Sequence, residues 1–179
     1  MISEFSARPK PTNNNAKYAF ISSLSLALAV FIFSLTLEKY KGAVGMIALV
    51  LLTFALFIYT RYIAVLYFYD ITFDGEGKPI FVVRQKIGKR DSTLCRIDLY
   101  SIKKIEKETA EERKRHKTPV GYLKYVYSPT LFPSVTYRIT VLSGYEKSEV
   151  IIECPDEFAN TLELYAKEAS EYIAEEDYE

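Results

Sequence analysis

The sequence has little of the chemistry on which most enzymes depend. Its 179 residues include one histidine, two cysteines and no tryptophan. Cys95 and Cys154 lie in the apolar contexts TLCRI and IIECP, without CxxC spacing or a neighbouring histidine, so neither a metal site nor a disulfide framework is predicted. A nucleophilic pair would have to use His116, which lies in a charged stretch. We therefore predict no catalytic residue, no metal and no cofactor, and we expect that the chain is not an enzyme.

Two long stretches contain no charged residue at all. They run from Tyr18 to Leu37 and from Gly42 to Thr60, and only Glu38, Lys39, Tyr40 and Lys41 separate them. About 20 helical residues at about 1.5 Å each cross a hydrocarbon core of about 30 Å. Helix is also the form in which an isolated segment pairs its backbone groups in lipid. The sequence therefore predicts a transmembrane hairpin over residues 18–62, with spans at 18–37 and 42–60.

A cleaved signal peptide is the alternative interpretation of the first run. The run is longer than a typical signal-peptide core, and no small-x-small cleavage site precedes the second run. Because neither span contains a titratable residue, an ion or proton pathway would have no relay. The small-residue pairs Ser23 with Ala27, Ser25 with Ala29, and Gly45 with Ala48 predict close packing within the hairpin. An oligomer seam, or a polar conduit along Ser22, Ser23 and Ser25, stays open.

The flanking charges predict the orientation of the hairpin. Arg8, Lys10, Lys17 and Arg61 flank the outer ends of the spans, against Lys39 and Lys41 in the link. The positive-inside rule then places both termini in the cytoplasm of a multi-pass protein of the cell (inner) membrane. Free cysteines in the following domain agree with this assignment. Residues 1–17 contain two prolines and three consecutive asparagines, and we expect them to form a flexible polar tail.

After the hairpin, the pattern changes to that of a sheet closed by one helix. Val65, Tyr67, Tyr69 and Ile71 alternate with Leu66, Phe68, Asp70 and Thr72, as in a half-buried strand. Further strands are predicted at 80–87, 92–99, 102–105, 121–127, 134–143 and 148–154, which makes seven in all. Pro155 and Asp156 then open an amphipathic helix with Phe158, Leu162, Tyr165, Ala169 and Ile173 on its apolar face. Residues 174–179 are predicted to be an acidic tail.

The order of seven antiparallel strands and one C-terminal helix resembles a pleckstrin-homology (PH)-like split barrel. The phrases YDITFD (69–74), RIDLYSIKKIEK (96–107) and VIIECPDEFANTLE (150–163) are similar to segments of bacterial members of that family. The resemblance covers residues 65–173. It implies a PH-like domain that follows membrane spans, and any function taken from it is an analogy.

The basic residues of the domain suggest two contacts with lipid. By the resemblance, Lys78, Arg84 and Lys86 occupy positions loosely comparable to a phosphoinositide-binding pattern, although Asp74 and Glu76 lie close by. Arg113, Lys114, Arg115 and Lys117 form a basic run that would be attracted to an anionic leaflet. In both cases, a solvated surface is the alternative.

Charge is distributed unevenly along the domain. Residues 84–117 contain 12 basic and 6 acidic side chains, a net charge of +6, whereas residues 146–179 contain 2 basic and 12 acidic side chains, a net charge of −10. From Leu66 onward the chain is net negative, so nucleic-acid binding is not expected. No small-molecule substrate is indicated. We expect a membrane-anchored, non-catalytic scaffold that binds the bilayer and a protein partner or a second copy of itself. An accessory subunit of a membrane transport or export complex is the alternative.

Overall fold

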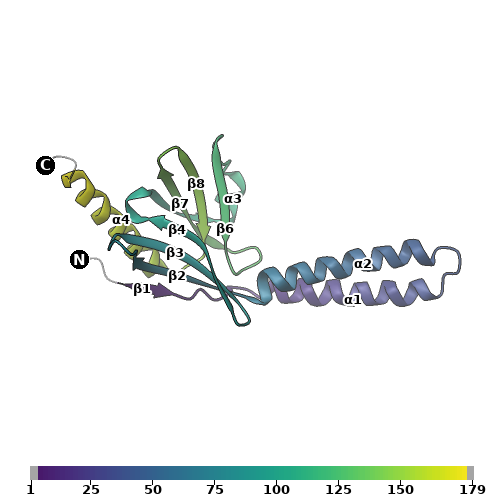
Figure 1. Ribbon diagram of the computed structural model, residues 1–179. Coiled ribbons are helices and arrows are strands. Elements are labelled where there is room, and N and C mark those ends of the chain that lie inside the picture. The colour runs from purple at the N-terminus through teal and green to yellow at the C-terminus, as the bar shows by residue number, and fades with distance from the viewer. Residues whose placement is uncertain (1–3, 177–179) are drawn as a thin grey trace. The chain divides into compact units, whose positions relative to one another are not determined.

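The computed structural model describes residues 4–176, with side chains as far as Glu171, and divides into two compact units (Figure 1). Residues 13–65 form a helical unit. Of the described residues, 4–12 and 66–176 together form a β domain. The element order is β1, α1, α2, η1, β2 to β4, η2, β5, α3, β6 to β8 and α4.

The helical unit is an antiparallel pair, α1 (Asn15–Leu35) and α2 (Lys41–Ile58), and α2 continues into the π-helical turn η1 (Tyr59–Ile63). Both helices are long and apolar enough to cross a membrane. The two predicted spans are therefore found as helices, with ends shifted by a few residues. Several hydroxyls within them donate to carbonyls of their own helix, such as Ser34 to Phe31 and Thr53 to Leu49, so these hydroxyls need no partner helix.

Small residues line the contact between the two helices. Ala27 and Ala48 are buried, and Ser23 and Gly45 are half-buried, as expected where helices approach closely. Ser25 and Ala29 are exposed on another face, so this predicted pair does not take part in the packing within the hairpin. Large apolar side chains also remain uncovered on both helices, including Phe31, Ile32, Met46 and Val50. A surface of this kind is typical of contact with lipid or another protein.

The β domain contains two four-stranded sheets. Sheet A has the order β1-β2-β3-β4, with β1 (Phe5–Ala7), β2 (Val65–Phe73), β3 (Pro79–Ile87) and β4 (Arg90–Asp98). Sheet B has the order β5-β7-β8-β6, with β5 (Ile102–Thr109), β6 (Tyr122–Tyr127), β7 (Val135–Ser143) and β8 (Glu146–Ile152). The short η2 (Leu99–Ser101) joins the sheets. All seven predicted strands are present, within a few residues of their expected ends.

Two features of the sheets differ from the prediction. The segment 1–17, expected to be a flexible tail, contributes β1, which pairs with β2 from Phe5 opposite Ile71 to Ala7 opposite Tyr69. In addition, β6 pairs with β8 in parallel, so the expectation of purely antiparallel strands is wrong. Seven residues, including Pro129 and Pro133, connect β6 to β7. This connection is longer than a tight hairpin turn, and β7 instead pairs with β5 and β8.

The core of the β domain is centred on an aromatic cluster. Phe158 of α4 (Asp156–Glu176) lies 5.7 Å from Phe5 and 6.1 Å from both Tyr69 and Phe81, measured between ring centroids. Leu162 and Ala169 of the predicted helix face are also buried. The side chain of Ile173, and the tail beyond Glu176, lie outside the described residues. The expected closing helix is therefore present, while the two sheets do not form a closed barrel.

Candidate functional site

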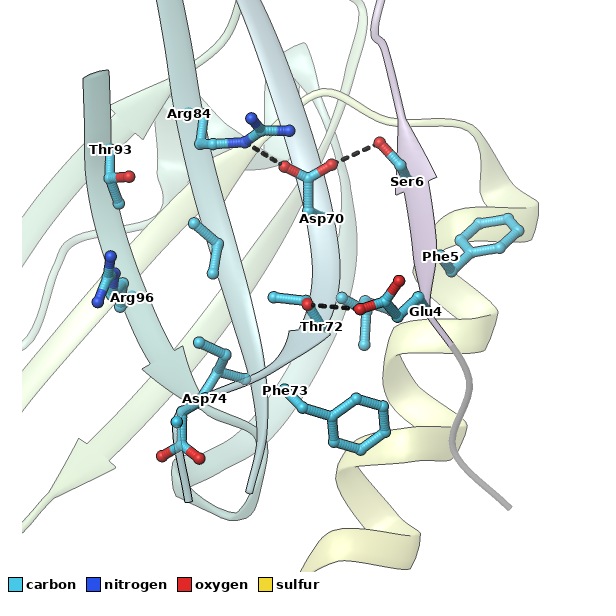
Figure 2. A pocket seen from close by; sticks show the side chains of 14 residues that line it. Glu4, Phe5, Ser6, Asp70, Thr72, Phe73, Asp74, Arg84, Thr93 and Arg96 are labelled. Atoms are coloured by element: carbon cyan, nitrogen blue, oxygen red, sulfur yellow. Dashed lines mark hydrogen bonds and ion pairs between the residues drawn. The ribbon is translucent and has the colours of Figure 1, made fainter. Parts of the chain in front are cut away.

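The outer face of sheet A carries a polar depression of about 590 Å³ (Figure 2). It is lined from all four strands and the β2–β3 turn by Glu4, Phe5, Ser6, Asp70, Ile71, Thr72, Phe73, Asp74, Gly75, Ile80, Val82, Arg84, Thr93 and Arg96. Strand alternation explains its polarity. Tyr69 and Ile71 turn into the core, so Asp70 and Thr72, which alternate with them, point outward.

Asp70 is the most connected side chain of this depression. Ser6 Oγ donates to Asp70 Oδ1 at 2.5 Å, and Arg84 Nε donates to Asp70 Oδ2 at 2.6 Å. Arg84 Nη1 also reaches Asp91 Oδ2 at 3.4 Å. The hydrogen bond to Asp70, with the charges of Asp70 and Asp91, raises the pKa of Arg84. Arg84 is therefore fixed by its neighbours and joins three strands of the sheet.

An aromatic ring accompanies this ion pair. The guanidinium carbons of Arg8 and Arg84 lie 5.6 Å and 5.8 Å from the centroid of Phe68, within the range of cation–π contacts. Residues before the hairpin (Ser6, Arg8) and after it (Phe68, Asp70) thus contribute to one surface.

One basic residue of the depression is not committed to an ion pair. Arg96 is exposed on β4 opposite Val82, and it forms no salt bridge with any residue that the structure describes. Thr93, opposite Arg84, supplies a nearby hydroxyl (Figure 2). A guanidinium of this kind binds carboxylates well. No group of three histidine, cysteine or carboxylate side chains suited to a metal occurs within the described residues. The surface is therefore suited to binding a polar partner.

The predicted headgroup residues do not come together. Lys78 pairs with Glu76 at 2.8 Å in the β2–β3 turn, Arg84 pairs with Asp70, and Lys86 is exposed toward the other end of β3. A strand of nine residues is about 30 Å long, so Lys78 and Lys86 cannot grip one headgroup. Arg84 is the only one of the three that lines the depression.

Most of the predicted lipid-contact run lies in a short helix, α3 (Ala110–Arg115), and Lys117 follows it. Thr109 and Glu112 cap it reciprocally, and the T-x-x-E spacing at 109–112 is the signal that could have revealed it. Arg113 is bound within the domain, because it donates to Thr136 Oγ1 at 2.9 Å and to the Pro133 carbonyl at 2.6 Å. Lys114, Arg115 and Lys117 are exposed and remain available to an anionic surface.

A buried charge cluster on sheet B was not predicted. Arg138 is 1% exposed and donates to Glu108 at 2.6 Å and 2.8 Å and to Glu149 at 2.5 Å. Thr118 and His116, which follow α3, also bind Glu149, at 2.9 Å and 3.0 Å. Burial alone would lower the pKa of Arg138, but its two carboxylate partners raise it above the ordinary value. The cluster fastens the segment after α3 to the sheet. The alternation of polar and apolar residues in VTYRITVL (135–142) could have revealed this cluster, because it places Arg138 on the same face of the strand as Thr136 and Thr140.

A second buried carboxylate holds the segment that precedes the hairpin. Glu153 is 5% exposed and accepts hydrogen bonds from Thr12 at 2.8 Å, from Thr130 at 2.7 Å and from Ser128 at 2.7 Å. Thr12 is the last residue of the β domain before the helical unit. The chain is therefore attached to the domain on the N-terminal side of the hairpin as well as through β2 on its C-terminal side.

The comparisons with known proteins do not name a family for this chain. A scan against models of protein families finds no match, and a search among curated proteins finds no matching relative. What the chain does must therefore be inferred from its own residues.

Proposed function

We propose that this chain is a membrane-anchored, non-catalytic interaction module whose β domain recruits a protein partner at the cytoplasmic face of the cell membrane. The observation that carries the proposal is topological. The apolar hairpin is inserted between β1 and β2, which are neighbouring strands of one sheet. An anchor joined to its domain at both ends restricts the domain more than a single flexible linker would.

We also propose that the β domain is a divergent relative of the PH-like split barrel. Two features support this relationship. A short connection joins the first sheet to the second sheet, and a C-terminal helix supplies Phe158 to the core. The parallel pairing of β6 with β8 is a departure from the expected pattern.

An accessory subunit of a transport or export complex is the second candidate. It is favoured by the exposed small residues Ser25 and Ala29 on α1, a surface on which a partner helix could approach closely. In this case the partner would be another membrane protein rather than a soluble one.

Purification of the tagged full chain in a mild detergent, followed by native mass spectrometry, tests both candidates. A stoichiometric soluble partner that is lost with Arg96→Glu but kept with the control Lys89→Glu would support the interaction module. A stoichiometric membrane partner lost with Ala29→Leu would support the accessory subunit. If the chain purifies without any partner in either case, both proposals fail.

A further inference from the structure

We propose that the partner of this module binds as an extended peptide, which adds to the free edge of β4 and enters the groove between the two sheets. This inference rests on the proposed function and names the site and the chemistry of the partner. Its peptide would alternate acidic and apolar side chains.

The free edge of β4 is the first observation. β4 lies at the end of sheet A and pairs only with β3. Along an antiparallel strand, alternate residues direct their N–H and C=O groups away from the paired neighbour. Within the described residues, no turn, loop or capping backbone hydrogen bond involves residues 94–98. Such an edge is a template for strand addition.

A groove runs along this same edge. It has a volume of about 350 Å³ and is lined by five consecutive residues of β4, Leu94 to Asp98, and by the inner face of sheet B: Tyr125, Tyr127, Val141, Ser143, Glu146, Ser148 and Val150, with Ser101 of η2. The rings of Tyr125 and Tyr127 stack at 6.3 Å. The strand register skips Leu94, which marks a bulge at this point.

One buried hydroxyl in the groove lacks a partner. Ser101 is 2% exposed, and among the described residues its Oγ makes no hydrogen bond. A buried polar group without a partner is costly, because it has lost its water and gained nothing in return. A backbone or side-chain group of a ligand that reached the floor of the groove would satisfy it. Ser101 therefore contributes a buried hydroxyl to the lining of the groove.

The two sides of β4 determine the chemistry of the peptide. Arg96 lines both the groove and the outer depression, so an added strand would run between these two surfaces. Side chains that turn outward would meet the Thr93 hydroxyl and the guanidinium of Arg96, which has no ion-pair partner among the described residues. Both groups favour a carboxylate. Side chains that turn inward would meet Tyr125, Val141 and Val150, which favour apolar groups, beside the hydroxyls of Ser143 and Ser148. The acidic Asp98 and Glu146 also line the groove and would disfavour inward carboxylates. Alternation in the peptide follows from the period of two in a strand.

The test uses the full chain in nanodiscs and a phage-displayed library of random dodecapeptides, with empty nanodiscs to remove peptides that bind lipid. We expect enrichment of peptides that alternate acidic and apolar residues. Bound peptide should slow hydrogen exchange in residues 90–98. Arg96→Glu should abolish the preference for acidic residues.

Two variants separate binding in the groove from other effects. Ser148→Trp should block the groove and abolish peptide binding, whereas Lys124→Trp, on the other face of neighbouring β6, should not. Ser101→Ala should weaken peptide binding by about three- to tenfold, as expected for one lost hydrogen bond, and leave the unfolding temperature equal or higher. If no peptide is enriched, if protection falls outside residues 90–98, or if a folded Ser148→Trp variant binds as the parent does, the proposal is wrong. Such a result would leave the co-purification test of the proposed function unaffected.

Discussion

Arg84 and Asp70 face each other on the outer side of sheet A, with 2.6 Å between Arg84 Nε and Asp70 Oδ2. Asp70 also accepts a hydrogen bond from Ser6 of β1, and Ser6 precedes the apolar hairpin in sequence while Asp70 follows it. This one carboxylate therefore ties together the two chain segments from which the hairpin emerges.

Replacement of Asp70 by Asn should destabilise the β domain. The amide loses the charge-assisted interaction with Arg84, and we expect a loss of about 1–2 kcal/mol, reduced from the value for a buried pair because Arg84 is partly exposed. Asp91→Asn is the matched control, since Asp91 is more exposed and lies 3.4 Å from Arg84. It should cost about 0.5 kcal/mol or less. Chemical unfolding of the detergent-solubilised full chain measures both, and equal effects would contradict the prediction.

Phe5→Ala tests whether the N-terminal segment belongs to the folded domain. The Phe5 ring stacks on Phe158, and its removal should cost about 1–2 kcal/mol because the ring is half-buried. Phe73→Ala, at the exposed end of β2, should have a smaller effect. A Phe5→Ala variant as stable as the parent would mean that β1 contributes nothing to the domain in solution.

The contrast between β1 and β2 shows what the sequence could predict. β2 has nine residues with clear alternation, and its buried side chains Tyr67, Tyr69 and Ile71 follow that alternation. β1 has only three residues, too few for a period to be recognised, and its partner strand is more than sixty residues away in sequence. Its surroundings of proline and asparagine instead indicated disorder. Local patterns thus identified the elements, while pairings over long distances had no local signal.

In the candidate site, too, local sequence patterns were readable and contacts between distant residues were not. The basic composition of 113–117 was readable, but the commitment of Arg113 to Thr136 and Pro133 depends on how α3 packs. The network of Glu153 also joins Thr12 to Ser128 and Thr130 of the β6–β7 connection, more than a hundred residues later in the sequence. No spacing in the sequence indicates that the Thr12 hydroxyl meets the other two.

The buried cluster around Arg138 predicts a loss of stability in acid. Burial alone would raise the pKa of Glu149, but hydrogen bonds from Thr118 and His116 and the charge of Arg138 outweigh it and lower the pKa below its ordinary value of 4.5. A carboxyl with a lowered folded-state pKa stabilises the fold above its unfolded pKa, and this contribution is lost as pH falls through the folded value. Unfolding free energy should therefore decrease below about pH 4.5.

Glu149→Gln separates this cluster from other carboxylates. The variant should be less stable than the parent at pH 7, because Arg138 loses a buried charged partner. The difference between the two proteins should shrink as the pH is lowered from 5 to 3. Glu163→Gln on α4, where the carboxylate is exposed and pairs with Lys167, is the control and should track the parent. A constant difference between parent and Glu149→Gln across this range would rule out the assignment.

The exposed basic residues Lys114 and Arg115 of α3, and Lys117 just after it, should respond to anionic lipid. With the full chain in nanodiscs, we expect slower hydrogen exchange in residues 110–117 when the bilayer contains anionic lipid than when it is zwitterionic. The combined variant Lys114→Gln, Arg115→Gln and Lys117→Gln should lose this difference, at about 1 kcal/mol for each basic residue near the surface. High salt should also remove it, because mobile ions screen the attraction.

Arg113 is left intact in this variant because it is bonded to Thr136 and its loss would disturb the fold. The control is the charge-matched set Lys86→Gln, Lys89→Gln and Arg90→Gln around the β3–β4 turn. Anionic lipid that has no effect on residues 110–117 of the parent would show that this basic segment is simply solvated.

The orientation of the hairpin is testable by labelling single cysteines introduced at Asn14, Tyr40 and Ser143 in intact cells. Both termini are predicted to be cytoplasmic, so only Tyr40→Cys should react with a thiol reagent that cannot cross the membrane.

The two native cysteines should react little with the reagent. Burial, with the nearby charges of Asp156 and Glu153, raises the pKa of Cys154 to about 12, and burial also raises the pKa of Cys95. Protonated thiols react slowly, and replacing both cysteines by alanine removes what remains. Permeabilised cells, in which all three positions should react, provide the control for accessibility. Reaction at position 143 from outside intact cells would place the β domain, with its β4 edge and the exposed residues of α3, on the side of the membrane opposite the anionic cytoplasmic leaflet. The proposed recruitment of a cytoplasmic partner would then be wrong.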